Sequence, residues 1–215
     1  MEEQIEGKKG VQLLDSLYGK CLNGIPKISK PVNELANDYI RKYGKTDKAI
    51  DKLVRNQLSK NGINGFISGF GGFTTLPVTL PANITSVLYV QMRMIAAIAL
   101  IRGYDLNDDE VQTFVYSCIA GVTIADTFKQ AGIKVGNKII LNSVNKIPGK
   151  VLVQINQRIG FRFITKAGTK GIINLGKLVP IVGAGIGSTI DWTATWTIAN
   201  RAKKIFEGSN VINMN

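Results

Sequence analysis

The amino-acid sequence predicts an all-α protein: a compact multi-helix domain with glycine-rich, tightly packed helices. Apolar residues recur at intervals of three and four along several segments, which is the period of an amphipathic helix. Glycine, proline and capping residues separate these segments at the places where helices begin and end. With 215 residues, of which 45% are hydrophobic, the chain is long enough to bury a sizeable core. We therefore expect an N-terminal helical extension over residues 1–30, a helical domain over 31–207 and a short flexible tail over 208–215.

The first part of the chain is predicted to hold a charged extension followed by two amphipathic helices. The extension stops around residues 24–26, where glycine and proline interrupt it. The first amphipathic helix spans residues 32–43 and ends at Gly44, and Thr46 then offers an N-cap for the second. The second helix continues to Gly62. The residues that share its apolar side are Ala49, Ile50, Leu53, Val54 and Leu58.

The longest uncharged run, residues 62–92, is broken by glycines and prolines before a long helix begins at Pro81. This helix stops with Arg102 and Gly103. Its most apolar window carries Arg93 near the middle, where a bilayer would impose a penalty of about 2.5–3.5 kcal/mol. We therefore expect a buried core helix. A helical hairpin that dips into one leaflet is the alternative that stays open for residues 62–101.

Two further helices follow, and the second of them has a competing interpretation. Asn107 with Glu110 three places on resembles a capping box, so a helix is predicted to open there and run past Cys118. Residues 151–164 alternate in a way that also suits a pair of strands. We favour a helix, because a helix places the cations of this stretch opposite one apolar and small-residue stripe. That stripe consists of Gly160, Phe163, Ile164, Ala167 and Gly171.

Charge is concentrated in one part of the chain. The formal net charge is +12, and the 64 residues between Asp126 and Asp191 contain ten cations and no carboxylate. Most of these cations lie four residues apart, so on a helix they drift only about 40° per step and stay near one side. Like charges on one side of a helix repel one another, and an anionic partner would relieve this repulsion. The predicted anion-binding residues are Lys134, Lys138, Lys146, Lys150, Arg158, Arg162, Lys166 and Lys170.

Small residues spaced four apart predict close contacts between helices. This spacing lets two helix backbones approach each other, both in bilayers and in tight soluble bundles. We favour the soluble interpretation, because the flanking segments are short and charged. The glycines predicted to mediate packing are Gly65, Gly69, Gly132, Gly136, Gly171, Gly183 and Gly187.

The composition excludes several kinds of chemistry. The chain has no histidine, so catalytic triads that use histidine are excluded, and the commonest metal ligand is missing. Cys21 and Cys118 stand alone, which indicates two small apolar residues and neither a disulfide framework nor a zinc site. An enzyme would have to rely on Asp126 near Lys129 or on Asp191, which we interpret as capping or ion-paired residues. We expect no catalysis, no cofactor and no metal.

Six strings of residues carry a resemblance to a known family: residues 69–78, 89–99, 103–105, 160–162, 165–171 and 179–187. Taken together, they resemble the EcsC-like proteins over most of the chain. The resemblance implies a bacterial, mainly helical protein that is associated with membrane processes. The family is named for a product of an operon that encodes an ABC transporter, so a transporter complex is an implied partner. No catalytic residue is implied at any position.

Two functions remain open from the sequence. The first is a non-catalytic adaptor that docks on anionic lipid or on a membrane protein complex. We expect it to be cytoplasmic and peripheral at the inner face of the membrane, because the acidic start of the chain lacks the features of a secretory signal. The alternative is a nucleic-acid-binding protein that neutralises phosphates with the same cations and stacks bases on Phe161 and Phe163. A solvated basic face without any ligand is the third interpretation.

Overall fold

The computed structural model describes residues 2–58, 82–122, 129, 147–167 and 192–207. Within these ranges the chain forms helices and no strand, which confirms the predicted all-α class and the helical interpretation of residues 151–164. The helices are α1 (Glu2–Asn23), α2 (Val32–Tyr43), α3 (Asp47–Leu58), α5 (Ala82–Ile101), α6 (Asp109–Ala120), α8 (Gly149–Ala167) and α10 (Trp192–Ile205).

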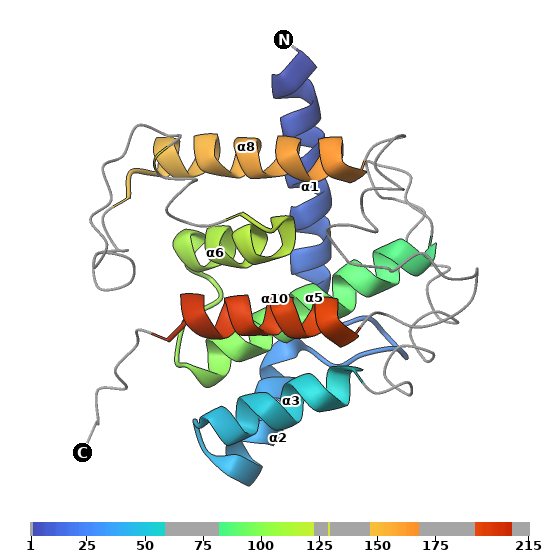
Figure 1. The fold of residues 1–215 in the computed structure, drawn as a ribbon, viewed down its shortest axis with the longest axis vertical. Coiled ribbons are helices and arrows are strands. Elements are labelled where there is room, and N and C mark those ends of the chain that lie inside the picture. The colour runs from blue at the N-terminus through green and yellow to red at the C-terminus, as the bar shows by residue number, and fades with distance from the viewer. Residues whose placement is uncertain (1, 59–81, 123–128, 130–146, 168–191, 208–215) are drawn as a thin grey trace.

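Helix α5 is the centre of the fold. It contacts α1, α2, α3, α6 and α10, and every side chain from Thr85 to Ala99 is buried (Figure 1). Arg93 is among them, so the predicted buried core helix is confirmed. No helix in the part of the chain that the structure describes has the length and hydropathy needed to cross a bilayer. Of the alternative hairpin, stated for residues 62–101, residues 62–81 lie outside the described ranges.

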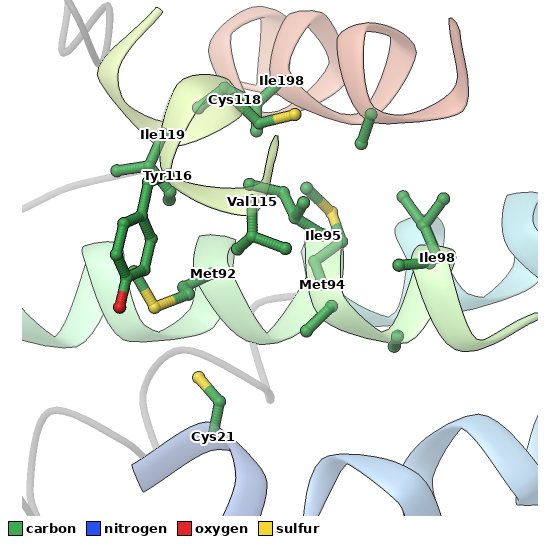
Figure 2. Close-up of a cluster of buried hydrophobic side chains, with 14 of the residues drawn as sticks. Cys21, Met92, Met94, Ile95, Ile98, Val115, Tyr116, Cys118, Ile119 and Ile198 are labelled. Carbon is green, nitrogen blue, oxygen red and sulfur yellow. The ribbon is translucent and has the colours of Figure 1, made fainter. Parts of the chain in front are cut away.

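The core is built on both sides of α5. Figure 2 shows α5 side chains between helices α6 and α10 on one side and Cys21 of α1 on the other. Because side chains all round α5 are buried, helices pack against it on several sides. The residues labelled there are Cys21, Met92, Met94, Ile95, Ile98, Val115, Tyr116, Cys118, Ile119 and Ile198.

Helix α1 belongs to this core along its C-terminal half. Its buried side chains are Leu13, Leu14, Leu17, Tyr18 and Cys21, each at most 3% exposed. Its N-terminal half crosses α8 and projects past it (Figure 1). The division of the chain at residue 30 stays a prediction, but the packing shows that α1 closes one side of the core around α5.

Polar bonds fasten α1 to α6 and to the turn before it. The hydroxyl of Tyr116 donates to the carboxylate of Asp15 over 2.6 Å, and the amide of Gln112 donates to the same oxygen over 3.1 Å. The hydroxyl of Tyr18 donates to the backbone carbonyl of Leu106 over 2.7 Å. Since buried polar groups are costly unless they are paired, these bonds make the arrangement of α1 on α6 specific.

The last turn of α1 and the segment between α1 and α2 are held to α5 by two buried polar side chains. Arg93 is 6% exposed and donates from Nη2 to the carbonyl of Lys30 over 2.8 Å. The hydroxyl of Tyr89 lies 2.6 Å from Oγ of Ser29 and donates to the carbonyl of Lys20 over 3.3 Å. Burial lowers the pKa of Arg93 from its ordinary value. The charge near the middle of α5 therefore anchors a neighbouring loop inside the fold.

Several predicted helix ends are confirmed. Helix α2 ends at Gly44, which has φ 71° and donates its backbone N–H to the carbonyl of Ile40 over 2.7 Å. This left-handed conformation favours glycine. Thr46 caps α3, because its Oγ1 accepts the backbone N–H of Ala49 over 3.3 Å.

The predicted capping box at Asn107 and Glu110 is wrong. Helix α6 begins at Asp109, and its N-cap is Asp108, which makes no side-chain cap bond. Asn107 is engaged elsewhere: both its backbone N–H and its side-chain amide donate to the carboxylate of Asp105, over 2.9 and 2.8 Å. The carboxylate of Asp105 accepts the backbone N–H that the side chain of Glu110 would bind in a capping box, so that reciprocal bond does not form.

Buried tyrosines and cysteines predict that the protein loses stability at alkaline pH. Burial raises the pKa of Tyr89 and that of Cys118 to about 12, and it also raises the pKa values of Tyr18, Tyr116 and Cys21. A phenol whose pKa is higher in the folded protein keeps its proton there, while the unfolded chain releases it near pH 10. The two buried thiols behave in the same way, but the unfolded chain releases their protons near pH 8.5. Stability is therefore fully present below about pH 8 and falls as the pH rises toward 12.

We expect the free energy of unfolding, measured by urea titration with circular dichroism, to be level at pH 6–7, to begin to fall above about pH 8 as the unfolded thiols ionise, and to fall by about 2 kcal/mol for Tyr89 alone by pH 12. Tyr89→Phe is the matched control, since it removes one titrating group and should make the decline shallower. A free energy of unfolding that stays constant to pH 12 would contradict the prediction.

Candidate anion-binding face

Helix α8 separates an exposed polar side from a buried apolar side. The side chains exposed at four-residue intervals are Lys150, Gln154, Arg158 and Arg162, and we call them the basic face. Those buried in the core, each at most 4% exposed, are Leu152, Ile155, Ile159 and Phe163. At about 100° per residue, the basic face spans an arc of about 120°. Helix α8 contains no Asp or Glu, so no carboxylate of its own relieves the repulsion along this arc.

The structure brings together part of the predicted set of cations. Lys150, Arg158 and Arg162 share the basic face, with Gln154 between them. Lys166 belongs to the last turn of α8, but its side chain lies outside the described part of the chain. The same holds for the whole residues Lys134, Lys138, Lys146 and Lys170, whose contribution stays a prediction.

The backbone of α8 packs tightly against that of α1 where the two helices cross. A Cβ atom built on Gly10 would lie 2.1 Å from the carbonyl oxygen of Gly160, and one built on Gly160 would lie 2.4 Å from that of Gly7. Real side chains do not tolerate such distances, so only glycine lets these two backbones touch. The contact holds the turn of α8 that carries Arg158 and Arg162.

Sequence reasoning missed this crossing. Gly160 was placed in the small-residue stripe of its helix, but Gly7 and Gly10 were not singled out. Their spacing of three, on a segment that looks like a charged extension, was the available signal. The glycines that were singled out all lie outside the residues that the structure describes: Gly65, Gly69, Gly132, Gly136, Gly171, Gly183 and Gly187.

The two aromatic residues of α8 differ in burial. Phe163 is 1% exposed in the core. Phe161 is half-buried, with its Cβ 3.6 Å from the position that a Cβ on Gly7 would occupy. Phe163 therefore has no surface on which a base could stack, and Phe161 lies beside α1. The interpretation of both side chains as packing residues is the better one.

The other candidate chemical groups do not form a site in the described ranges. Cys21 and Cys118 are buried as free thiols, and burial raises the pKa of both, that of Cys118 to about 12. This environment suits small apolar residues. Among the described residues no three His, Cys, Asp or Glu side chains gather as metal ligands would. Asp126 and Asp191 lie outside these ranges.

These features define an all-α domain that is wrapped around one buried helix and that presents a basic helix at its surface. The chain belongs to the EcsC protein family, whose family model matches residues 30–207 of the 215. The match covers every described helix except α1. No curated protein and no solved structure matches the chain.

Proposed function

We propose that this protein is a non-catalytic adaptor that docks reversibly on anionic lipid at the inner face of a bacterial membrane. The observation that supports this proposal is the basic face of α8, where Lys150, Arg158 and Arg162 are exposed on one side of a helix without carboxylates. On the resemblance described above, a membrane protein complex such as a transporter is the second partner that we propose.

The charge on the basic face is sufficient for reversible docking. A Lys or Arg near an anionic leaflet contributes about 1 kcal/mol, so these cations together contribute about 3 kcal/mol, or roughly 150-fold in partitioning. Such attraction decays over a Debye length of about 8 Å at physiological salt. Binding should therefore weaken as salt is added, and it should require anionic lipid.

The proposal is tested by sedimentation with vesicles that contain increasing fractions of phosphatidylglycerol. We expect the variant Lys150→Gln, Arg158→Gln, Arg162→Gln to lose roughly 100-fold in partitioning, because about 3 kcal/mol of attraction is removed. The matched control is Lys45→Gln, Lys52→Gln, Arg55→Gln, which removes the same charge from exposed positions in and before α3. Helices α8 and α3 lie at opposite ends of the molecule (Figure 1).

The outcomes separate the candidate functions. A loss confined to the α8 variant supports docking through the basic face, whereas equal losses in both variants indicate attraction by net charge alone. Binding that ignores the lipid charge contradicts the proposal. A gel shift with nucleic acid at physiological salt, abolished by the α8 variant, would favour the nucleic-acid alternative. If the protein binds neither anionic vesicles nor nucleic acid, the basic face is a solvated surface without a ligand.

A further inference from the structure

We propose that the buried guanidinium group of Arg93 binds a small free oxyanion such as phosphate, beneath the segment that joins α1 to α2. This inference is independent of the proposed docking function, because Arg93 belongs to the central helix α5 and takes no part in the basic face. It assigns a ligand to a charge that no carboxylate of the described residues neutralises.

Arg93 is a buried cation whose neighbours do not balance its charge. It is 6% exposed, and within the described ranges no Asp or Glu forms an ion pair with it. The titratable groups that interact with it electrostatically are the phenol of Tyr89, the thiol of Cys21 and the phenol of Tyr39, which are ordinarily uncharged near neutral pH. The preceding stretch of sequence, residues 62–92, contains no Asp or Glu either. Burying an unpaired charge is costly, so burial lowers the pKa of Arg93.

The guanidinium group has donors that the described residues do not use. Its one hydrogen bond within them runs from Nη2 to the backbone carbonyl of Lys30 over 2.8 Å, and a neutral carbonyl leaves the positive charge uncompensated. Nε is buried and has no acceptor among them. Because a guanidinium is rigid and planar, the N–H of Nε and that of a neighbouring Nη nitrogen can reach two oxygens of one ligand. Covalent geometry therefore makes these donors converge.

The guanidinium group lies directly under a surface segment. The carbonyl that Nη2 contacts belongs to Lys30, whose side chain is exposed. In the same segment Oγ of Ser29 lies 2.6 Å from the hydroxyl of Tyr89, one turn before Arg93 on α5. Lys27 and Lys30 are both exposed there, so their positive charge attracts an anion from solution. A headgroup fixed in a bilayer does not reach a group beneath this segment, which favours a free anion.

An oxyanion suits these donors better than a halide does. Phosphate and carboxylate oxygens accept two parallel N–H bonds from one guanidinium, and such charge-assisted bonds are short and strong. A halide accepts at a single point. Two charge-assisted hydrogen bonds correspond to a Kd on the order of 1 mM. Inorganic phosphate is therefore the probe, with chloride as the reference ion.

The test measures the folding equilibrium by urea titration at pH 7, in phosphate and in chloride of the same ionic strength. With a Kd of about 1 mM, about 20 mM phosphate should raise the folding equilibrium constant of the wild type about 20-fold. Arg93→Gln should lose this increase. The matched control is Arg201→Gln, because Arg201 also donates to a backbone carbonyl, from Nη1 to Cys118 over 3.2 Å, but is half-buried. This variant should keep the increase.

Equilibrium dialysis with radiolabelled phosphate provides a measurement that does not depend on the folding of Arg93→Gln. The wild type should bind one phosphate per chain, with saturation near the same Kd, and chloride should not displace it. The variant Lys150→Gln, Arg158→Gln, Arg162→Gln should bind the same phosphate, since the basic face is a different part of the molecule. Loss of this binding in the α8 variant would overturn the inference.

The remaining outcomes decide between a built site and its alternatives. Equal folding constants in both salts, or dialysis without saturation, overturn the inference. A phosphate response that persists in Arg93→Gln indicates an adventitious ion only and overturns it as well. Arg93→Gln should bind phosphatidylglycerol vesicles within about twofold of wild type; a loss as large as that of the α8 variant would assign Arg93 to a lipid headgroup and refute the free anion.

Discussion

Replacing Gly160 by alanine is expected to lower the free energy of unfolding by about 3 kcal/mol, the upper range for overpacking a tight contact. The new Cβ would lie 2.4 Å from the carbonyl oxygen of Gly7 and 2.7 Å from the backbone nitrogen of Val11. These atoms belong to the backbone of α1, so no change of rotamer relieves the overlap, and α1 and α8 must move apart. Thermal unfolding should shift downward by roughly 10 °C for a chain of this length.

Gly19→Ala is the matched control for this prediction. Gly19 lies within α1, and a Cβ built there has nothing within 4 Å. The same substitution should therefore stabilise the protein by up to about 1 kcal/mol, since alanine has the higher helix propensity. If Gly160→Ala were as stable as wild type by thermal and urea unfolding, the backbone contact between α1 and α8 would be refuted.

Removal of residues 1–29, which leaves the segment that matches the family, is expected to abolish cooperative folding. Helix α1 buries five core side chains, and each fully buried apolar side chain contributes about 1.5–3 kcal/mol. Their sum, about 10 kcal/mol, is as large as the whole stability of a typical domain. We expect weak near-ultraviolet circular dichroism, strong binding of a hydrophobic dye and no sharp thermal transition.

Deletion of residues 2–5 alone provides the control for this truncation. Glu3, Gln4 and Ile5 are exposed, Ile5 at 49%, and the glycines that touch α8, Gly7 and Gly10, are retained. This shorter deletion should change the free energy of unfolding by less than about 1 kcal/mol. A sharp unfolding transition in the protein that lacks residues 1–29 would show that α1 is dispensable for the core.

Sequence periodicity was sufficient to predict the helices that bury one apolar stripe. Ala49, Ile50, Leu53 and Val54 of α3 are fully buried, as their spacing required. The same reasoning favoured helix over strand for α8, because a helix places Arg158 on the exposed side and Phe163 on the apolar side. In each case the information lies within a single segment, where side chains three and four residues apart must share a side.

Prediction failed where two segments compete or meet. Asn107 and Glu110 were expected to form a capping box at α6, but the carboxylate of Asp105 accepts the backbone N–H of Asn107 in place of Glu110, and a spacing rule does not weigh that competition. Gly7 and Gly10 looked like part of a polar extension, because their partner, Gly160, lies 150 residues further along the chain. The sequence of one segment does not show which distant backbone will pack against it.

The amino-acid sequence alone determined the helical class, the burial of α5 and the positive side of α8, since all of these follow from the order of apolar and charged residues within a helix. Only the tertiary structure decided that α1 closes the core, that its glycines touch α8, and that Lys150, Arg158 and Arg162 reach the surface together. The physical reason is that periodicity orients residues about their own helix axis, whereas the choice of neighbouring helix depends on close packing between segments far apart in the chain.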